Sequence, residues 1–165
     1  RWNPVTIFNY EKYTDNNIKI IPNKWTLRWT EKAHQFAEWS KDRSHKVGCV
    51  IVDNDNRLLS QGYNGFPEGI DDNIDDRHNR PGKYEWTVHS EVNAIFAAAK
   101  NGVSLKGSTI YCTLFPCASC AGGIIQSGIK RVVSYYPDLS HHKYGKSFEI
   151  SQQMFKEAGI EINYL

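Results

Sequence analysis

The sequence predicts an α/β protein in which helices cover a mixed β-sheet. Strand-like apolar runs alternate with segments of helical periodicity from about Trp25 onward, and two neighbouring runs are joined by the turn residues 54–56. This alternation is typical of a mixed sheet layered by helices. With 165 residues, of which 40% are hydrophobic and 23% charged, the chain is long enough for one domain with a sizeable core.

The first 24 residues are rich in aromatic residues and asparagine but show no clean period. We therefore expect an irregular arm over residues 1–24 and a single domain over residues 25–165. The domain opens with a helix that we expect to run to about Lys41, because one of its faces is marked at helical spacing by Trp29, Ala33, Phe36, Ala37 and Ser40. Two strands, VGCVIVD (47–53) and RLLSQGY (57–63), follow as a hairpin, because the three residues between them are turn formers.

A long loop over residues 64–88 comes next and is dense in Gly, Asp, Asn and Pro. Long ordered loops often carry function. The helix that starts at His89 ends at Asn101 and Gly102, which tolerate the left-handed conformation of a helix C-cap. Its apolar residues recur at i, i+3, i+4 and i+7 and predict a core-facing stripe of Val92, Ile95, Phe96 and Ala99.

The remaining chain supplies three more strands and two more helices. The expected strands are STIYCTL (108–114), KRVVSYY (130–136) and IEINYL (160–165). Between them lie a helix over residues 117–127 that is stopped by Gly128, and a helix over residues 147–158 that ends before Gly159.

Charge and hydrophobicity restrict the classes of partner. The formal net charge is +2 and the basic residues are scattered, whereas a nucleic-acid binder more often carries a basic stripe. We therefore expect a small-molecule partner and no nucleic acid. The longest apolar runs are too short to span a bilayer and no secretory leader is recognisable, so we expect no membrane partner and a cytoplasmic location.

The four cysteines fall into two classes. Cys49 and Cys112 lie in apolar strand-like runs and are expected to be buried thiols. Cys117 and Cys120 lie at i and i+3 at the start of a helix, which puts both sulfur atoms on one side of the first turn. By itself, a Cys-x-x-Cys pair is typical either of a redox centre or of half a zinc site.

His89 and Glu91 distinguish between these two possibilities. Two thiolates and one imidazole provide three protein ligands and leave the fourth tetrahedral position of zinc open, as in catalytic sites. A closed structural site would require Cys112 or Cys49 to leave its strand. A carboxylate that does not ligate the metal can take a proton from the zinc-activated water, pass it to a substrate ring nitrogen and later protonate the leaving amine.

The combination H-x-E…P-C-x-x-C is the signature of zinc-dependent nucleobase deaminases. The chain resembles the cytidine deaminase superfamily, and more narrowly the deoxycytidylate (dCMP) deaminases of phage type. The resemblance runs from about Trp29 to Ile162 and is carried by GCVIVDNDNRLLSQGYNGFPEG, HSEVNAIFAAAKNG, TIYCTLFPCASCAGGIIQSGIKRVV and AGIEI.

The resemblance implies a three-layer α/β/α sandwich with a mixed five-stranded sheet. It implies zinc held by His89, Cys117 and Cys120, with Glu91 as proton shuttle in the hydrolysis of dCMP to dUMP, which feeds thymidylate synthesis. It also implies a homohexamer that is activated by dCTP and inhibited by dTTP, each with magnesium. In this family an effector site is associated with the box Gly62, Tyr63, Asn64 and Gly65, and Asn64 lies near the substrate sugar.

The segment SKDRSHK (40–46) offers Ser40, Lys41 and Arg43 to a 5′-phosphate, although simple surface solvation competes with this interpretation. Tyr136 is a candidate wall for the base, with core packing as the alternative. A deaminase acting on tRNA or single-stranded DNA would share the zinc core, but the acidic loop beside the site would repel a polyphosphate strand. A non-enzymatic zinc module and a redox protein are further alternatives; the first has no use for Glu91 and the second would not bind stoichiometric zinc.

Overall fold

The computed structural model describes residues 22–165, and the greater part of the expected N-terminal arm lies outside them. One mixed sheet of five strands, in the order β2-β1-β3-β4-β5, forms the centre of the protein. The strands are β1 (Gly48–Val52), β2 (Leu58–Tyr63), β3 (Thr109–Cys112), β4 (Arg131–Ser134) and β5 (Glu161–Tyr164). β1 is antiparallel to both β2 and β3, whereas β3, β4 and β5 are parallel. The predicted hairpin and mixed sheet are therefore confirmed.

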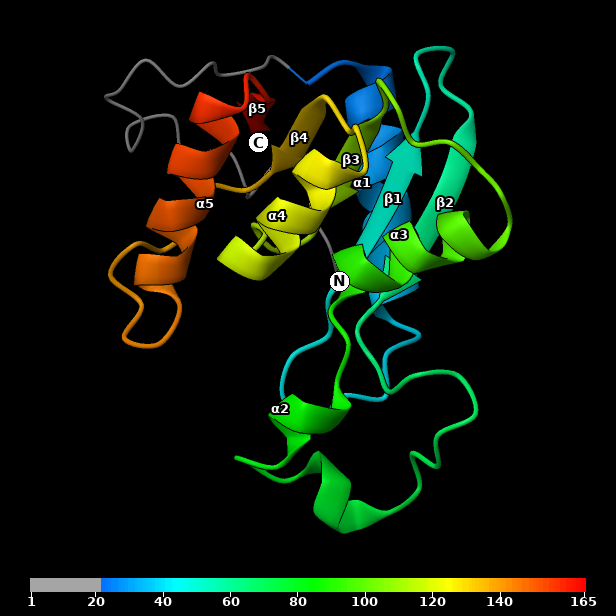
Figure 1. Cartoon of the computed structure of the whole chain (residues 1–165), viewed down its shortest axis with the longest axis vertical. Helices are drawn as coiled ribbons and strands as arrows, with labels where there is room; N and C mark the ends of the chain where they lie inside the picture. Colours follow the sequence, from blue (N-terminus) through cyan, green and yellow to red (C-terminus); the bar gives the residue numbers. More distant parts are fainter. Residues whose placement is uncertain (1–21) are drawn as a thin grey trace.

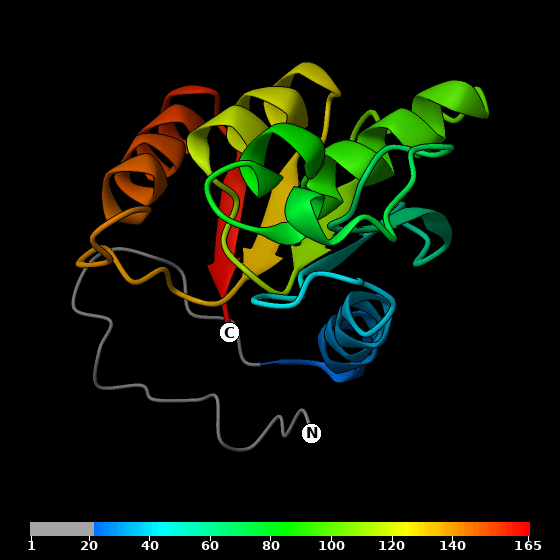
Figure 2. The same cartoon turned by 90° about the horizontal axis from the view of Figure 1, so that it is seen from below.

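Helices cover both faces of this sheet (Figures 1 and 2). Helix α1 (Lys24–Ala37) lies alone on one face, and α3 (Ser90–Lys100), α4 (Ala118–Gln126) and α5 (Gly145–Glu157) lie on the other, as Figure 2 shows. The expected three-layer α/β/α sandwich is thus confirmed.

The two faces of the sheet bury two separate apolar clusters. The larger cluster lies under α3, α4 and α5 and includes Ile110, Ile124 and Phe155. The smaller one lies under α1 and includes Ala33, Val50 and Val133 among others. Both cysteines that were expected to be plain buried thiols, Cys49 and Cys112, are free and buried. No helix within residues 22–165 has the length and hydrophobicity needed to cross a membrane.

Helix α1 ends at Ala37, so the expectation that it runs to about Lys41 was wrong. Ser40, which the pattern placed on the helix, is instead tied to the loop that follows β2. Its hydroxyl group donates to the carbonyl oxygen of Asn64 at 2.7 Å and accepts the backbone N–H of Asp42 at 3.2 Å. These two bonds favour the departure of the chain from helical geometry before Lys41.

The expected core-facing stripe of α3 was wrong for Phe96 and Ala99, whereas Ile95 is partly buried and packs against the larger core cluster. Ala94 and Ala98 are buried, whereas Phe96 is 67% exposed and Ala99 is exposed. The reason lies in β2, where a Cβ atom added to Gly62 would lie 2.2 Å from the carbonyl oxygen of Ser90 and 2.7 Å from the backbone nitrogen of Ala94. Strand and helix approach so closely that alanine occupies the contact, and the large side chain of Phe96 lies outside it.

The segment over residues 64–88 contains more regular structure than the sequence predicted. It forms a short 3₁₀ turn, η3 (Asp75–His78), and the single-turn helix α2 (Lys83–Trp86), and it projects from the end of the sheet where α3 begins (Figure 1). Paired backbone hydrogen bonds between Gly65 and Val88 close its base, at 3.1 and 2.8 Å. The ring of Phe66 stacks on that of His78 inside it.

Candidate metal centre and active site

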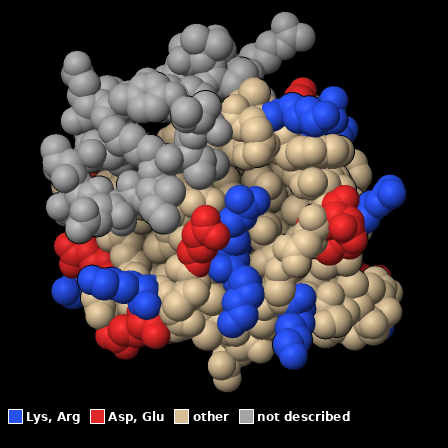
Figure 3. Space-filling model, turned by 90° about the horizontal axis from the view of Figure 1, so that it is seen from above, with Lys and Arg blue, Asp and Glu red and all other residues tan. Residues whose placement is uncertain are grey.

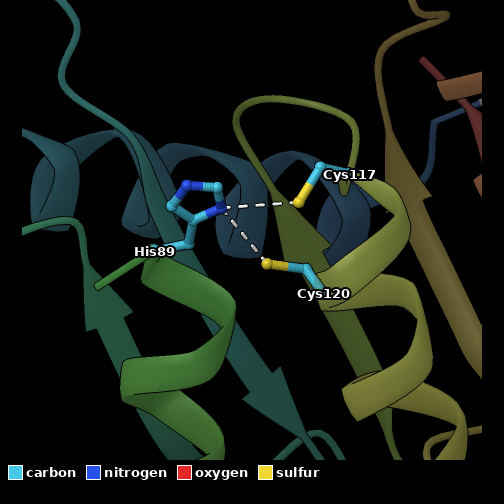
Figure 4. Close-up of side chains that lie close together, drawn as sticks. All are labelled: His89, Cys117 and Cys120. Atoms are coloured by element: carbon cyan, nitrogen blue, oxygen red, sulfur yellow. Dashed lines mark hydrogen bonds between the residues drawn. The ribbon is translucent and has the colours of Figure 1, made fainter. Parts of the chain in front are cut away.

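Two helix N-termini bring three potential metal ligands together (Figure 4). His89 is the N-cap residue of α3, Cys117 is the N-cap residue of α4, and Cys120 lies in the first turn of α4. The Nδ1 atom of His89 lies 3.5 Å from Sγ of Cys117 and 3.4 Å from Sγ of Cys120. Among the described residues, these three form the one group of histidine, cysteine or acidic side chains close enough to share a metal ion.

The spacing of these atoms fits zinc. A tetrahedral zinc ion with Zn–S bonds of about 2.3 Å and a Zn–N bond of about 2.0–2.1 Å places a nitrogen and a sulfur ligand roughly 3.5 Å apart. Both nitrogen–sulfur distances in the cluster match this value closely. Cys120 is buried, Cys117 half-buried and His89 exposed, so the cluster is open to solvent on the His89 side. The residues present can therefore hold zinc through three ligands.

The thiols and the imidazole are electrostatically coupled. Hydrogen bonding from Cys120, together with that from His89, lowers the pKa of Cys117 to about 4. The pKa of Cys120 is raised, because its S–H group donates to the Cys117 thiolate and because it is buried. The hydrogen bond to Cys117 raises the pKa of His89. Cys117 is thus the thiol that ionises first, and ionised sulfur is the form that binds metal.

Glu91 lies beside this cluster in the first turn of α3 and is 4% exposed. Burial raises the pKa of its carboxyl group, and the negative charge of Cys117 adds to this effect. The Ser90 hydroxyl group donates to Oε2 of Glu91 at 3.0 Å. A carboxyl group with its pKa moved toward neutrality suits a group that must both accept and return a proton near pH 7.

A residue that the sequence analysis missed fixes the start of α4. Cys117 has no side-chain capping bond of its own, and the backbone N–H of the next residue, Ala118, donates to Oγ of Ser147 at 2.8 Å. Ser147 belongs to α5, which packs beside α4. No spacing rule connects residues 118 and 147, so only the packing of the two helices reveals this contact.

Asn64 and Ser40 hold the loop between α1 and β1 in place. The side-chain oxygen of Asn64 accepts the backbone N–H of Val47 at 2.8 Å, and its amide nitrogen donates to the carbonyl oxygen of His45 at 2.9 Å. Ser40 donates to the backbone of Asn64. Both residues are buried, so in this structure they organise the loop.

The other expected substrate contacts also have protein partners. Nζ of Lys41 lies 2.8 Å from a carboxylate oxygen of Asp72, and Arg43 forms an ion pair with Asp75, in both cases with an exposed cation. Tyr136 packs edge-on against Tyr164, with ring centroids 5.0 Å apart.

A buried ion pair that the sequence analysis missed fastens α2 to the same loop. Nζ of Lys83 lies 3.1 Å from both carboxylate oxygens of Asp42 and 3.3 Å from Oγ of Ser44. The two charged side chains are 8% and 9% exposed. Forty-one positions separate the partners, and in the sequence each belongs to a stretch that looks like solvated loop.

The four residues of the box at 62–65 have visible structural contacts. Gly62 allows the close approach of β2 to α3, and Gly65 closes the base of the projecting segment. Tyr63 is partly exposed and packs edge-on against Trp39, with ring centroids 6.1 Å apart. The expected effector role of the box stays a prediction.

Comparison with known proteins agrees with this geometry. Residues 23–136 match the family model for the cytidine and deoxycytidylate deaminase zinc-binding region. An uncharacterized deaminase from the luxG 3′ region of Aliivibrio fischeri is 40% identical over 146 residues, which cover 87% of this chain and 95% of the relative. Mouse deoxycytidylate deaminase is 36% identical over 142 residues, 83% of this chain and 77% of the mouse protein.

A solved structure of a dCMP deaminase has a similar fold. The dCMP deaminase of cyanophage S-TIM5, crystallised in complex with dCMP and dUMP, superposes with a TM-score of 0.70 at 26% identity, and the match covers 88% of this chain and all of that one. Together with the matched family model and the zinc-compatible cluster, this shows that the chain belongs to the cytidine and deoxycytidylate deaminase family.

Proposed function

We propose that this enzyme hydrolyses dCMP to dUMP and ammonia with the help of zinc. The observation that carries the proposal is the three-ligand cluster of His89, Cys117 and Cys120, open on one side and flanked by the buried Glu91. The deoxycytidylate deaminases among its relatives and the S-TIM5 complex support the choice of dCMP. The product dUMP would supply thymidylate synthesis.

In this proposal three residues bind the metal and Glu91 transfers protons. His89, Cys117 and Cys120 would hold zinc, which when bound lowers the pKa of a coordinated water to about 7. Glu91 would accept the proton of the attacking water, deliver it to the ring nitrogen of cytosine and protonate the departing amine. Its buried position and raised pKa suit both directions of proton transfer.

The loop between α1 and β1 would form one wall of the substrate site. Lys41 and Arg43 can turn toward a 5′-phosphate only by giving up their carboxylate partners Asp72 and Asp75, and ion pairs with such exposed cations are weak. Asn64 would contact the sugar through the second hydrogen atom of its amide group, while Ser40 positions Asn64. Tyr136 would border the base.

Regulation and assembly form a second part of the proposal. The enzyme would be a homohexamer, activated by dCTP and inhibited by dTTP, each bound with magnesium at the box of Gly62, Tyr63, Asn64 and Gly65. The exposed side chains of Trp39 and Phe96 are apolar surface that subunit contacts would cover.

The deaminase domain would span residues 25–165, and residues 1–24 would form the N-terminal arm. All four cysteines are free, which suits the reducing cytoplasm, of the host cell if a phage encodes the protein.

A nucleic-acid substrate is less compatible with the charge distribution. The face in Figure 3, which is seen from the side opposite to the projecting segment of Figure 1, mixes basic and acidic side chains. The projecting segment beside the metal cluster has more acidic than basic residues, namely Glu68, Asp71, Asp72, Asp75, Asp76 and Glu85 against Arg77, Arg80 and Lys83. A strand of phosphates would meet repulsion there.

An assay of ammonia release distinguishes between a nucleotide substrate and a nucleic-acid substrate. Wild-type enzyme should deaminate dCMP faster than dCTP, deoxycytidine or a cytosine-containing oligonucleotide, and dCTP or dTTP with magnesium should change the rate. Glu91→Gln should retain zinc and fold but lose about a hundredfold or more of the turnover. Faster deamination of the oligonucleotide than of dCMP would contradict the proposed substrate, and full turnover in Glu91→Gln would contradict the role of Glu91.

A further inference from the structure

A cavity of about 400 Å³ lies between the first turn of α1 and the edge of the sheet where β3, β4 and β5 begin. Trp25 of α1, Thr109 of β3 and Arg131 of β4 line it. Cys117 follows the end of β3, and the box at 62–65 lies at the end of β2, so both are at the opposite edge of the sheet. In Figure 1 the edge with the cavity lies at the top and the projecting segment at the bottom. The cavity is therefore separate from the candidate active site, and its volume is typical of sites for small metabolites.

The guanidinium group of Arg131 is held at this cavity by three uncharged partners. Its Nε atom donates to Oγ1 of Thr109 at 3.2 Å, and its two terminal nitrogens donate to Oδ1 of Asn163 at 3.4 Å and to the hydroxyl group of Tyr111 at 3.2 Å. All three partners are buried. A guanidinium group has five N–H donors, so two remain after these bonds. The arginine is thus fixed in position and can still donate to a ligand.

The positive charge of Arg131 has no carboxylate partner within residues 22–165, where the ion pairs engage five other cations. Lys130 also lines the cavity, is exposed and takes part in none of these ion pairs. Helix α1 begins here as well, since its N-cap residue Asn23 lines the cavity, and a helix N-terminus carries a partial positive charge. An anion that enters the cavity would therefore meet two cations that have no anionic partner in this part of the chain.

Two acidic residues line the same cavity and restrict the kind of ligand. Oδ1 of Asp53 accepts two backbone N–H groups of the following turn, both at 2.9 Å, and Oε1 of Glu161 accepts Nδ2 of Asn163 at 3.2 Å. Neither carboxylate forms an ion pair with Arg131 or Lys130. Figure 3 looks onto this end of the molecule, where basic and acidic side chains lie next to one another. The cavity thus suits a ligand with one anionic group for the cations and hydroxyl groups that can donate to the carboxylates.

We propose that this cavity is a second ligand site, which binds a small polyol that carries a phosphate or carboxylate group. The oxyanion would accept the two remaining N–H groups of Arg131 and the ammonium group of Lys130, because a guanidinium group matches two oxygens of either anion. The hydroxyl groups of the polyol would donate to Asp53 and Glu161. The site would bind its ligand independently of dCMP, because none of these residues belongs to the metal cluster or to the loop between α1 and β1.

The indole N–H signal of Trp25 in a ¹H–¹⁵N NMR spectrum of the zinc-loaded protein reports on the cavity directly. The chain has five tryptophans, so Trp25→Phe identifies the signal and the other tryptophans serve as internal controls. Glycerol 3-phosphate, glycerate and glycerol are the probes, because they share a three-carbon body and differ in the charged group. We expect at least one of the two charged probes to shift the Trp25 signal in a saturable way. Glycerol, and sodium chloride at the same ionic strength, should not do so.

Three variants test which side chains bind the probe. Arg131→Gln removes the central cation and should weaken binding of the charged probe by about tenfold or more. Lys130→Gln changes an exposed side chain and should weaken binding by about two- to fivefold. Lys156→Gln in α5 is the matched control, because Lys156 is exposed and α5 lies on the other face of the sheet, and it should leave binding unchanged. Turnover of dCMP should stay at the wild-type value in all three variants.

A saturable shift with glycerol 3-phosphate alone identifies a phosphate site, and one with glycerate alone identifies a carboxylate site. Either result, or a shift with both probes, supports the inference if Arg131→Gln weakens binding. The absence of a saturable shift with both charged probes overturns it, as does unchanged affinity in Arg131→Gln. If Arg131→Gln does not fold, Lys130→Gln decides, and unchanged affinity there overturns the inference. Absence of dCMP turnover in the wild-type protein would contradict the proposed function without affecting this test, because the Trp25 signal reports binding and not turnover.

Discussion

The ion pair between Lys83 and Asp42 should contribute more to stability than any exposed ion pair within residues 22–165. Lys83→Met removes the ammonium group and keeps an unbranched apolar side chain of similar length. The Asp42 carboxylate would then remain buried with only the backbone N–H groups of Ser44 and His45 as donors. Loss of one partner of a buried pair typically costs about 3–5 kcal/mol, so we expect the free energy of unfolding to fall by about that amount.

Urea unfolding at pH 7 and a fixed zinc concentration measures this loss. Lys146→Met is the matched control, because Lys146 and its partner Glu149 are 82% and 49% exposed, and it should leave the unfolding free energy close to the wild-type value. The double variant Asp42→Leu with Lys83→Met should regain much of the lost stability, since no unpaired charge is left buried. An unfolding free energy of Lys83→Met within about 0.5 kcal/mol of that of the Lys146→Met control would refute the reasoning.

The same pair predicts a pH dependence. Burial raises the pKa of Asp42, but the backbone N–H groups of His45 and Ser44 and the charge of Lys83 outweigh this effect and leave the pKa below its usual value. A carboxyl group with a lowered folded pKa stabilises the fold above its unfolded pKa of about 3.9, and this contribution is lost as the pH falls through the folded value. The difference in unfolding free energy between wild type and Lys83→Met should therefore shrink at acid pH; a constant difference would argue against the pair.

Two further predictions concern the packing around the metal cluster. Ser147→Ala removes the hydroxyl group that accepts the backbone N–H of Ala118, next to Cys117, and should weaken zinc binding by about tenfold or more. Competition with a chelator measures the zinc affinity. An unchanged affinity would exclude this positioning role of Ser147. Gly62→Ala forces a Cβ atom against the backbone of Ser90 and Ala94 and should destabilise the fold by about 1–3 kcal/mol or more in urea unfolding. Its control, Gly122→Ala in α4, meets only a Met154 side-chain carbon at 3.7 Å and should be tolerated; equal effects of the two variants would contradict the close approach of β2 to α3.

Local sequence patterns predicted what depends on local physics. The turn residues between β1 and β2, the left-handed Gly102 after α3 and the order of strands and helices follow from backbone preferences that a short window reveals. The cluster of His89, Cys117 and Cys120 was predictable because each half of the motif lies at the start of a helix, where ligands are presented by local geometry.

Contacts between distant segments could not be predicted in the same way. The orientation of α3 depends on Gly62, a residue of another element that approaches the α3 backbone at Ser90 and Ala94 and leaves little space beside position 94. The periodicity of α3 alone therefore put Phe96 on the wrong side. The pairing of Asp42 with Lys83, like the bond from Ala118 to Ser147, depends on tertiary packing. The spacing of these residues along the sequence does not predict either contact.

The coordination of zinc in the purified enzyme tests the central claim most directly. X-ray absorption spectroscopy of the zinc-loaded protein should show two sulfur ligands at about 2.3 Å, one imidazole nitrogen at about 2.0–2.1 Å and one further light atom that exchanges with solvent. Cys117→Ala should remove one of the sulfur ligands. A fourth ligand from the protein, or purified enzyme without stoichiometric zinc, would contradict a three-ligand centre that leaves a position open beside Glu91.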